Sequence, residues 1–286
     1  MIEVISPGPY ASVQDLGRPG FAHLGVPGSG AADVASLKLA NRLVGNPEGL
    51  AGIELTFGSA RLRFLAGAWA ALAGAPVPAG PVRGAGMGAP FWVPAGAELR
   101  LGVPARGLRT YLAVRGGIAV PPVLGSRSTD SLSGLGPEPL RAGTRLPVGP
   151  AVGGLVADYA PLPELGPAVL RVLPGPRDDW FVPEALAELC AAPYVVTQDS
   201  NRVGVRLRGP ELVRARAGEL PSEGMVTGAV QVPPSGQPIV FLADHPPTGG
   251  YPVIAVLRAA DLAVAAQLRP GDEVRFTLGP PAFSQA

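Results

Sequence analysis

The sequence contains few of the residues that most often carry metal, redox and Schiff-base chemistry. Its 286 residues include one cysteine, two histidines and one lysine. The single Cys190 excludes a disulfide framework or a thiolate metal cluster within the chain. With only His23 and His245, a histidine-rich zinc site is not expected either, and we expect no metal. Lys38 lacks the glycine and hydroxyl neighbours of a phosphate-binding loop and the flanking methionines of a biotin carrier.

Charge is also scarce. Charged residues make up 16% of the chain, and the formal net charge is +1. A net charge this close to zero produces no strong electrostatic field that would attract nucleic acid or an anionic membrane, so we expect neither as a partner. Residues 1–9 do not have the basic and apolar segments of a signal peptide. The uncharged run 64–82 is rich in alanine and glycine and contains three prolines, so we expect no membrane span. The lone cysteine fits a reducing compartment, and we expect a cytoplasmic protein.

Glycine and proline, in contrast, are abundant. There are 40 glycines and 35 prolines, together about 26% of the chain. Disorder is nevertheless not expected, because 47% of the residues are hydrophobic and the mean hydropathy is +0.28. We interpret these residues as turns between many short strands.

Hydrophobic periodicity predicts a mainly β fold with a few short helices. Short apolar or alternating segments near glycine or proline predict strands at Ile2–Ile5, Ala60–Leu65, Glu98–Val103, Thr110–Val114, Leu170–Leu173, Val203–Leu207, Pro238–Leu242, Val253–Leu257 and Glu273–Leu278. Helices are predicted at Ala31–Val44, Pro183–Ala192 and Ala259–Leu268, with Ser29 as the cap of the first. This pattern favours barrels or sandwiches.

Three segments of the first half recur in the same order in the second half. The pairs are Ile2–Pro9 with Leu170–Pro176, Gln14-Asp15-x-x-Arg18-x-Gly20 with Gln198-Asp199-x-x-Arg202-x-Gly204, and Pro94–Arg100 with Pro270–Arg275. The spacing is longer in the second half, where the helix Pro183–Ala192 is inserted. We therefore predict two related β-barrels, at 1–165 with a C-terminal extension and at 166–286.

Polar side chains gather around one predicted strand of the second half. Gln231 precedes this strand, and Asp244, His245, Thr248 and Tyr251 follow it. Loops at the mouth of a rigid barrel are common binding sites, and His245 is a candidate general base. A hydrogen-bonded loop with structural glycines accounts for the same residues. The sequence alone leaves both interpretations open.

Two further segments are candidate anion sites. Arg202 and Arg206, next to Asn201, would share one face if the strand started at Arg202, and paired guanidiniums suit carboxylate or phosphate. The loop Leu124–Asp130 offers Arg127 and Ser128. Surface arginines or inter-barrel salt bridges are the other interpretation of the first segment, and turn capping is the other interpretation of the second.

Taken together, the motifs resemble a known family. They are Ser12–Gly20, Gly25–Asp33, Ala40–Asn46, Tyr111–Ile118, Leu124–Thr129, Ser200–Leu207 and Gln231–Tyr251. The resemblance is to the allophanate hydrolase subunit 2 family, which is also known as the family of 5-oxoprolinase C subunits, as KipA or as the biotin-dependent carboxyltransferase family. It covers Val4 to about Phe276. One departure is Asp244-His245-Pro246-Pro247 before Thr248, where relatives usually carry glutamine and threonine.

The resemblance implies tandem cyclophilin-like β-barrels. It also implies two partners, a KipI-like B subunit of similar barrel type and a lactam-binding A subunit. Their shared activity would be ATP-dependent opening of 5-oxo-L-proline, a small-molecule substrate, to L-glutamate. In that scheme Arg127, Arg202 and Arg206 hold negative oxygens, and His245 or Asp244 manages protons.

ATP enters only as a co-substrate of the complex, and the sequence leaves its binding place open. Two alternatives remain from the same resemblance. One is a Kip-type regulatory binder that antagonises an inhibitor of a histidine kinase. The other is the carboxyltransferase component of a urea-carboxylase or allophanate-type system, which would need a biotin carrier on another chain.

Overall fold

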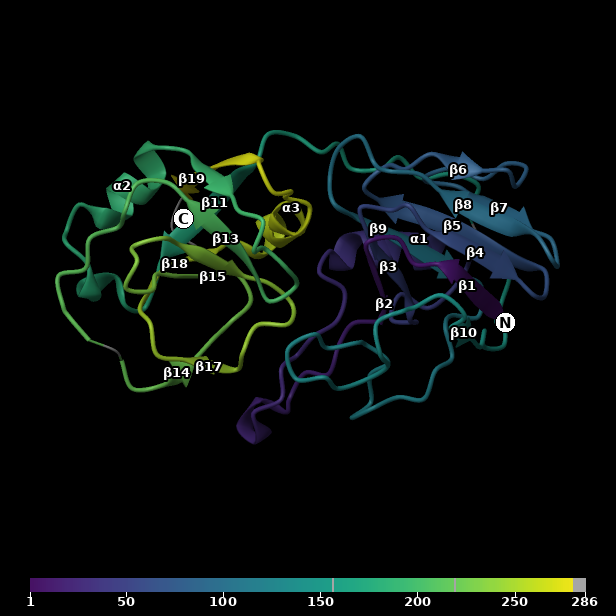
Figure 1. Cartoon of the computed structure of the whole chain (residues 1–286), viewed down its shortest axis with the longest axis horizontal. Coiled ribbons are helices and arrows are strands. Elements are labelled where there is room, and N and C mark those ends of the chain that lie inside the picture. Colours follow the sequence, from purple (N-terminus) through teal and green to yellow (C-terminus); the bar gives the residue numbers. More distant parts are fainter. Residues whose placement is uncertain (156, 219, 280–286) are drawn as a thin grey trace, which may run out of the picture. The chain divides into compact units, whose positions relative to one another are not determined.

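The computed structural model describes residues 1–155, 157–218 and 220–279, and within these ranges the chain is mainly β. The residues group into two compact units. Unit 1 contains Met1–Arg18 and Ser29–Leu165, and unit 2 contains Pro19–Gly28 and the chain from Gly166 onward. The strands of each unit can be followed in Figure 1. The predicted fold class is confirmed.

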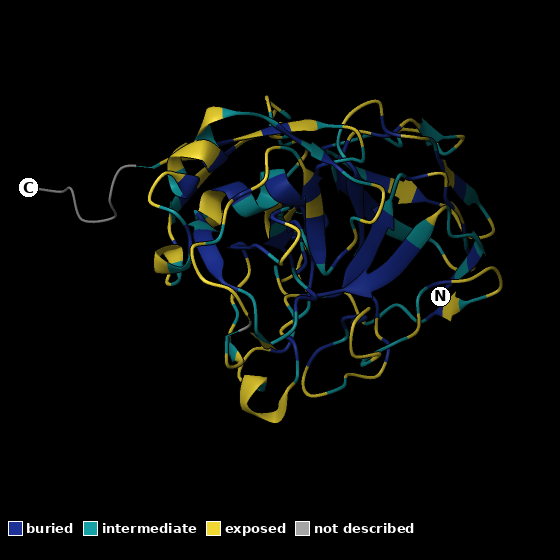
Figure 2. Ribbon diagram, turned by 60° about the vertical axis from the view of Figure 1, so that its left-hand side comes forward, coloured by how far each residue is buried: buried dark blue, intermediate teal, exposed yellow. Residues whose placement is uncertain are grey.

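Unit 1 is built from two antiparallel five-stranded sheets. The first sheet has the order β10 (Arg145–Leu146), β1 (Ile2–Ser6), β4 (Arg61–Phe64), β8 (Glu98–Leu101), β6 (Ala79–Gly80). The second has the order β2 (Tyr10–Gln14), β3 (Gly52–Thr56), β9 (Arg109–Val114), β5 (Ala68–Gly74), β7 (Pro90–Val93). Alternate residues of both sheets enter one hydrophobic core, as the period of two requires. Figure 2 shows these buried residues in dark blue along the strands.

The helix α1 (Val34–Leu43) covers the outer face of the second sheet. Leu37 and Ala40 pack there against the small side chains of β5 and β9, among them Ala71 and Ala113. The helix begins at Asp33, whose Oδ1 accepts from the Ser36 amide at 3.0 Å. The predicted cap at Ser29 was therefore wrong. Its hydroxyl donates instead to the carbonyl of Thr129 at 3.1 Å.

Unit 2 is a closed seven-stranded barrel. Its order is β11 (Val169–Pro174), β18 (Val253–Leu257), β15 (Ala229–Gln231), β16 (Ile239–Phe241), β13 (Gly204–Arg208), β12 (Tyr194–Val196), β19 (Glu273–Leu278), and the parallel pairing of β19 with β11 closes it. Closure leaves no sheet edge exposed among these described strands. Their inward side chains form the core of the unit together with α2 (Ala185–Ala191) and α3 (Leu262–Ala266).

Three short 3-10 helices and a two-stranded ribbon complete the described fold. The 3-10 helices are η1 (Ala22–Leu24), η2 (Asp178–Trp180) and η3 (Ala259–Asp261), and the ribbon pairs β14 (Glu223–Gly224) with β17 (Thr248–Gly249). Among the described residues, no helix is both long and apolar enough to cross a membrane.

The first and third repeated segments form strands in both units, but the pairing of these strands differs. In unit 2, β11 and β19 are hydrogen-bonded neighbours. In unit 1, the corresponding strands β1 and β8 both pair with β4, which lies between them. The first and last strands of the repeat thus meet directly only in the barrel of unit 2.

Candidate functional site

The ladder between β13 and β16 continues past both strands and brings Arg202 beside Asp244. Gly204 pairs with Phe241 at the end of the regular ladder. Beyond it, the Leu242 amide donates to the Val203 carbonyl at 2.9 Å, and the Asp244 amide donates to the Arg202 carbonyl at 3.1 Å. The second bond is offset by one residue from the register of the ladder, so the regular pairing ends there while the two segments, about forty residues apart in sequence, stay side by side.

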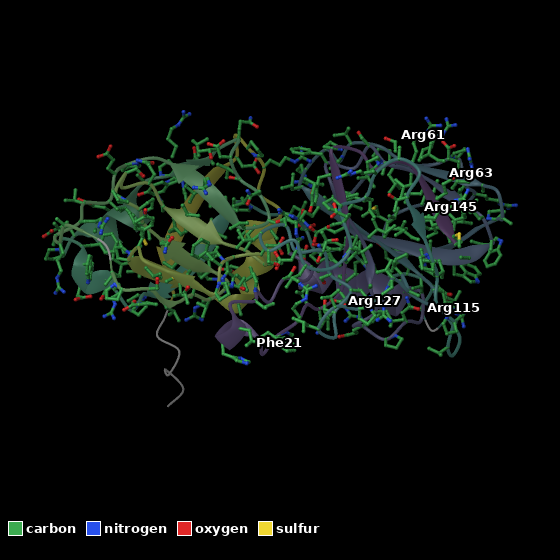
Figure 3. The ribbon with its side chains drawn as sticks, turned by 60° about the horizontal axis from the view of Figure 1, so that its bottom comes forward. Phe21, Arg61, Arg63, Arg115, Arg127 and Arg145 are labelled. Atoms are coloured by element: carbon green, nitrogen blue, oxygen red, sulfur yellow. The ribbon has the colours of Figure 1, made fainter. Side chains whose placement is uncertain are left out.

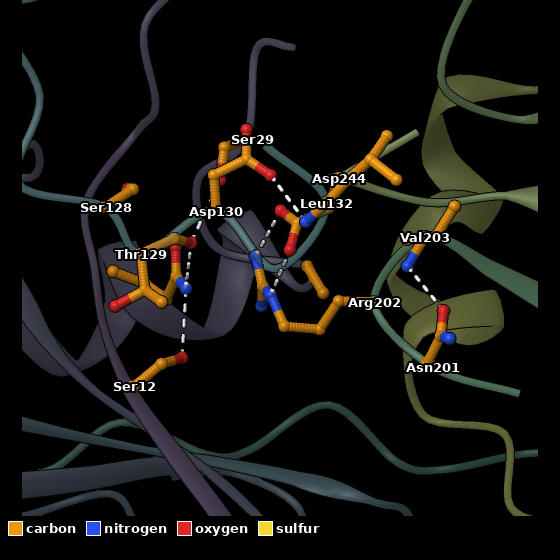
Figure 4. Close-up of polar contacts among 12 residues, drawn as sticks. Ser12, Ser29, Ser128, Thr129, Asp130, Leu132, Asn201, Arg202, Val203 and Asp244 are labelled. Atoms are coloured by element: carbon orange, nitrogen blue, oxygen red, sulfur yellow. Dashed lines mark hydrogen bonds and ion pairs between the residues drawn. The ribbon is translucent and has the colours of Figure 1, made fainter. Parts of the chain in front are cut away.

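The side chains of Arg202 and Asp244 form a buried bidentate ion pair. Nε of Arg202 donates to Oδ2 of Asp244 at 2.9 Å, and Nη2 donates to Oδ1 at 3.1 Å (Figure 4). The two side chains are only 4% and 0% exposed. A planar guanidinium that donates two parallel hydrogen bonds to one carboxylate has a fixed orientation. Both carboxylate oxygens of Asp244 are engaged, which leaves this residue poorly placed to carry protons.

His245 follows directly and is held on two sides. Its ring stacks on Phe241 with centroids 5.8 Å apart and planes at 26°. Nδ1 lies 2.8 Å from the carbonyl oxygen of Pro246. Because a carbonyl only accepts, we assign the proton of a neutral ring to Nδ1. Nε2 then presents a lone pair, the form that a general base requires.

Gln231, another predicted site residue, is the last residue of β15. Its Nε2 donates to the Tyr251 carbonyl at 3.2 Å and approaches the Met225 sulfur at 3.8 Å. A Cβ at Gly249 would lie 2.8 Å from this nitrogen, so glycine permits the close approach. Thr248 is exposed in β17, next to Gly249. The structure thus brings Gln231 and Tyr251 together through a backbone carbonyl and not through the phenol.

The β14–β17 ribbon is tied to the barrel by an ion pair. Nε of Arg177 lies 2.9 Å from each carboxylate oxygen of Glu223, and its Nη2 also contacts that carboxylate. The guanidinium holds the pKa of the Glu223 carboxyl below its usual value. No sequence pattern predicted this pair, because the two residues lie on segments far apart in the chain.

Arg206 does not join Arg202. The regular strand starts at Gly204, so the alternation that would align the two arginines does not reach Arg202. Arg202 is buried, whereas Arg206 is exposed and lines a polar surface hollow of about 580 Å³ together with Gln198, Asp199, Ser200 and Asn201. Asn201 caps its own turn there by accepting from the Val203 amide at 2.8 Å. The expectation of two arginines on one face is corrected accordingly.

The predicted anion loop of unit 1 surrounds a carboxylate of its own chain. Oδ1 of Asp15 accepts from the hydroxyls of Ser126 and Ser128 at 2.6 and 2.7 Å and from the Gly17 amide at 2.8 Å. Oδ2 accepts from the Arg127 amide at 2.6 Å. The Arg127 side chain donates through Nε to the Val120 carbonyl at 2.8 Å. These contacts match the capping interpretation of the loop.

A second buried arginine was not among the predicted site residues. Arg18 is 1% exposed, its Nη1 lies 3.9 Å from Oδ2 of Asp130, and its Nη2 donates to the Ser128 carbonyl. Arg18 and Arg202 are the matching arginines of the Gln-Asp-x-x-Arg repeat, and each has a buried aspartate beside it. The Gln-Asp-x-x-Arg repeat is the sequence signal from which Arg18 could have been predicted. Among the described residues, no three histidine, cysteine, aspartate or glutamate side chains gather in a way that could hold a metal.

Comparison with known proteins assigns the chain to a family. The carboxyltransferase domain, subdomain A and B, matches residues 24–278. The chain belongs to the carboxyltransferase domain family. The resemblance inferred from the motifs is therefore confirmed.

Relatives fall into two groups. The 5-oxoprolinase C subunit of Escherichia coli (strain K12) is 39% identical over 96% of this chain and 90% of its own length. The corresponding C subunit of Haemophilus influenzae is 32% identical, with 96% and 90% covered. The urea amidolyase of Lachancea kluyveri is 34% identical over 96% of this chain but only 17% of its own length.

Solved structures share the fold of this carboxyltransferase-domain chain. TTHA0988 aligns with a TM-score of 0.87 and 41% identity over 96% of this chain. The present chain spans 55% of the TTHA0988 chain. The K. lactis urea amidolyase aligns with a TM-score of 0.88 and 31% identity, with 97% of this chain and 18% of that chain covered.

Proposed function

We propose that this chain is a subunit of an ATP-dependent 5-oxoprolinase, which converts 5-oxo-L-proline with ATP and water to L-glutamate. The observation that carries the proposal is the match to the 5-oxoprolinase C subunit of E. coli, which extends over 90% of that protein. The urea amidolyase of L. kluyveri is matched over only 17% of its length. A chain of this size is thus comparable with the whole of a C subunit and with a small part of an amidolyase.

The proposal includes a complex with a KipI-like B subunit and a lactam-binding A subunit. The chemical reason for ATP is the stability of the lactam amide, whose resonance resists attack by water. Transfer of a phosphoryl group from ATP to the amide oxygen would turn that oxygen into a leaving group. Water can then add at the ring carbon, and the carbon–nitrogen bond breaks as the nitrogen takes up a proton. The resulting acyl phosphate is hydrolysed by a second water to the carboxylate and inorganic phosphate.

Within this scheme we assign proton transfer to His245. Its Nδ1–H is fixed by the Pro246 carbonyl, and its ring is fixed by Phe241, so Nε2 is oriented to accept a proton from water. Arg202 supplies positive charge whose direction is set by Asp244. Asp244 is then a positioning residue rather than the proton carrier expected as an alternative.

The remaining predicted site residues fall into three groups. Arg206, with Asn201 beside it, lines an open polar hollow that suits a substrate carboxylate. Gln231 is the last residue of β15, and Thr248 and Tyr251 lie in the segment after β16. Arg127 and Ser128 stabilise their own loop through Asp15. We propose that Arg206 and Asn201, and likewise Gln231, Thr248 and Tyr251, contact the substrate. For Arg127 and Ser128 we propose a structural role.

The test is reconstitution with the purified A and B subunits, 5-oxo-L-proline and ATP, with glutamate as the readout. Glutamate formation should require this chain. His245→Asn keeps a side-chain NH for the Pro246 carbonyl but removes the base, so kcat should fall by about 100-fold or more. His23→Asn changes the other histidine, an exposed residue, and should leave kcat unchanged. Full activity without this chain, or in His245→Asn, would contradict the assignment.

A carboxyltransferase role is the second candidate, favoured by the family match and the urea amidolyase relatives. It requires a biotinyl group on another chain. Addition of avidin separates the two, because it would abolish a biotin-dependent reaction and leave a 5-oxoprolinase unaffected. If the chain were a Kip-type regulator, it would bind the KipI-like partner, and adding it to the mixture would not increase the amount of glutamate formed.

A further inference from the structure

The outer face of the first sheet of unit 1 is covered by charged side chains. Along β4, Leu62 and Phe64 point into the core, whereas Arg61 and Arg63 are 47% and 42% exposed at their side chains. The other strands of this sheet alternate in the same way and present Glu3, Glu98, Arg100 and Arg145. Figure 3 labels Arg61, Arg63 and Arg145 on this part of unit 1.

The strand register arranges these side chains in two rows. In the first row Arg145, Glu3, Arg63 and Glu98 lie directly opposite one another on β10, β1, β4 and β8. Opposite charges therefore alternate across four strands. The distances are 3.6 Å from Arg145 to Glu3, 3.2 Å from Glu3 to Arg63 and 3.8 Å from Arg63 to Glu98. This row neutralises itself.

The second row is different. Arg61 on β4 lies directly opposite Arg100 on β8, with Ser6 and Gly80 as the cross-strand neighbours on the two sides. Like charges directly opposite each other in a sheet are destabilising. We call Arg61 and Arg100 the arginine pair.

The arginine pair has one shared counter-ion. Nε of Arg61 and Nε of Arg100 both donate to Oε1 of Glu98, at 2.7 and 2.9 Å. Glu98 also neutralises Arg63 in the first row. One carboxylate therefore serves three guanidiniums, and its pKa is held below the usual value mainly by its hydrogen bond from Arg61. In the described part of the chain, no second carboxylate reaches the arginine pair within 4.0 Å.

We propose that the arginine pair is a docking site for an acidic surface of a partner subunit. Guanidiniums that contact Glu98 through Nε can still offer their Nη atoms to an incoming carboxylate, and Arg suits such paired contacts. A carboxylate from the partner would also relieve the repulsion between the two arginines. The excess charge is small and the chain is nearly neutral, which favours a few protein carboxylates over the long polyanion of a nucleic acid.

This inference rests on the proposed function for the identity of the partner, namely the A or the B subunit of the 5-oxoprolinase complex. The test measures the affinity of the intact chain for each purified partner at several salt concentrations. The variant Arg61→Gln/Arg100→Gln removes both charges at similar length. The matched control is Arg275→Gln, an exposed strand arginine that pairs with Glu273 two residues away.

The double variant should raise Kd for one of the two partners by about tenfold or more and flatten its dependence on salt. Arg275→Gln should bind as the wild type does. The melting temperature provides a folding control, because the double variant loses two exposed ion pairs to Glu98 together with the repulsion between the arginines, so the melting temperature should change little.

Three outcomes would overturn the inference. If the wild type assembles and the double variant binds both partners with unchanged Kd and salt dependence, the docking site is wrong while the proposed function stands. If the wild type binds neither partner, both proposals fail. If the double variant loses instead the binding of a duplex DNA oligonucleotide, the face recognises a polyanion and not an acidic protein surface.

Discussion

Removing the carboxylate of Asp244 is expected to destabilise the barrel of unit 2 by about 3–5 kcal/mol. Asp244 is fully buried and Arg202 is 3% exposed. In Asp244→Ala the guanidinium loses both bidentate contacts and stays away from water, which is the costly outcome for a buried ion pair. With a urea m-value near 2 kcal/mol/M, the unfolding midpoint should fall by roughly 2 M.

The assay is urea unfolding followed by tryptophan fluorescence in a background where Trp69 and Trp92 are phenylalanine. Trp180 is then the remaining tryptophan and reports unit 2. The paired control is Arg202→Met/Asp244→Leu, which removes both charges and should lose much less stability than the single variant. A shift below about 1 kcal/mol in Asp244→Ala, or a double variant as unstable as the single one, would refute the reasoning.

Two further predictions concern carboxylates outside this pair. Asp15→Asn would place an NH₂ group against the Arg127 amide or the serine hydroxyls, so unit 1 should lose about 2–3 kcal/mol in urea unfolding monitored through Trp69 and Trp92, with Trp180 replaced by phenylalanine. Asp199→Asn at the exposed repeat position of unit 2 should stay within about 0.5 kcal/mol in the Trp180 assay. Asp261 accepts from Arg171 at 2.6 and 2.9 Å, and this contact lowers the pKa of its carboxyl below the ordinary 3.8. Because the folded pKa is the lower one, the pair stabilises the fold above the unfolded pKa and loses this contribution as pH falls through the folded value. The stability difference between wild type and Asp261→Asn should therefore shrink from about pH 5 to about pH 2 in acid titrations, and a constant difference would contradict it.

Short apolar or alternating segments were enough to locate the nine predicted strands, because most have one face in a core and β9 is buried on both faces. The strand β5 was missed, although it pairs with a strand on each side in the second sheet. Its sequence Ala68–Gly74 carries little β-propensity and no polar alternation. Its alanines let α1 approach the sheet, a requirement that arises only from tertiary packing.

The candidate site shows the same division between local and tertiary information. The Gln-Asp-x-x-Arg motif occurs twice, yet Asp15 is buried among hydroxyls and Asp199 is exposed. Nothing within the motif distinguishes these environments, because the partners come from the distant loop of Ser126 and Ser128. Likewise, Arg202 and Arg206 were expected together because the starting residue of the strand could not be known from alternation alone.

The parallel pairing of β19 with β11 has a consequence for the order of events during synthesis. The last strand of the barrel joins the first, from which about a hundred residues separate it. The chain must therefore emerge from the ribosome as far as Leu278 before the hydrogen bonds that close the barrel can all form. Until then the nascent unit is an open ribbon with two unpaired borders, and a chain cut short before Glu273 would keep them. Premature termination should therefore yield aggregated product rather than a smaller soluble barrel.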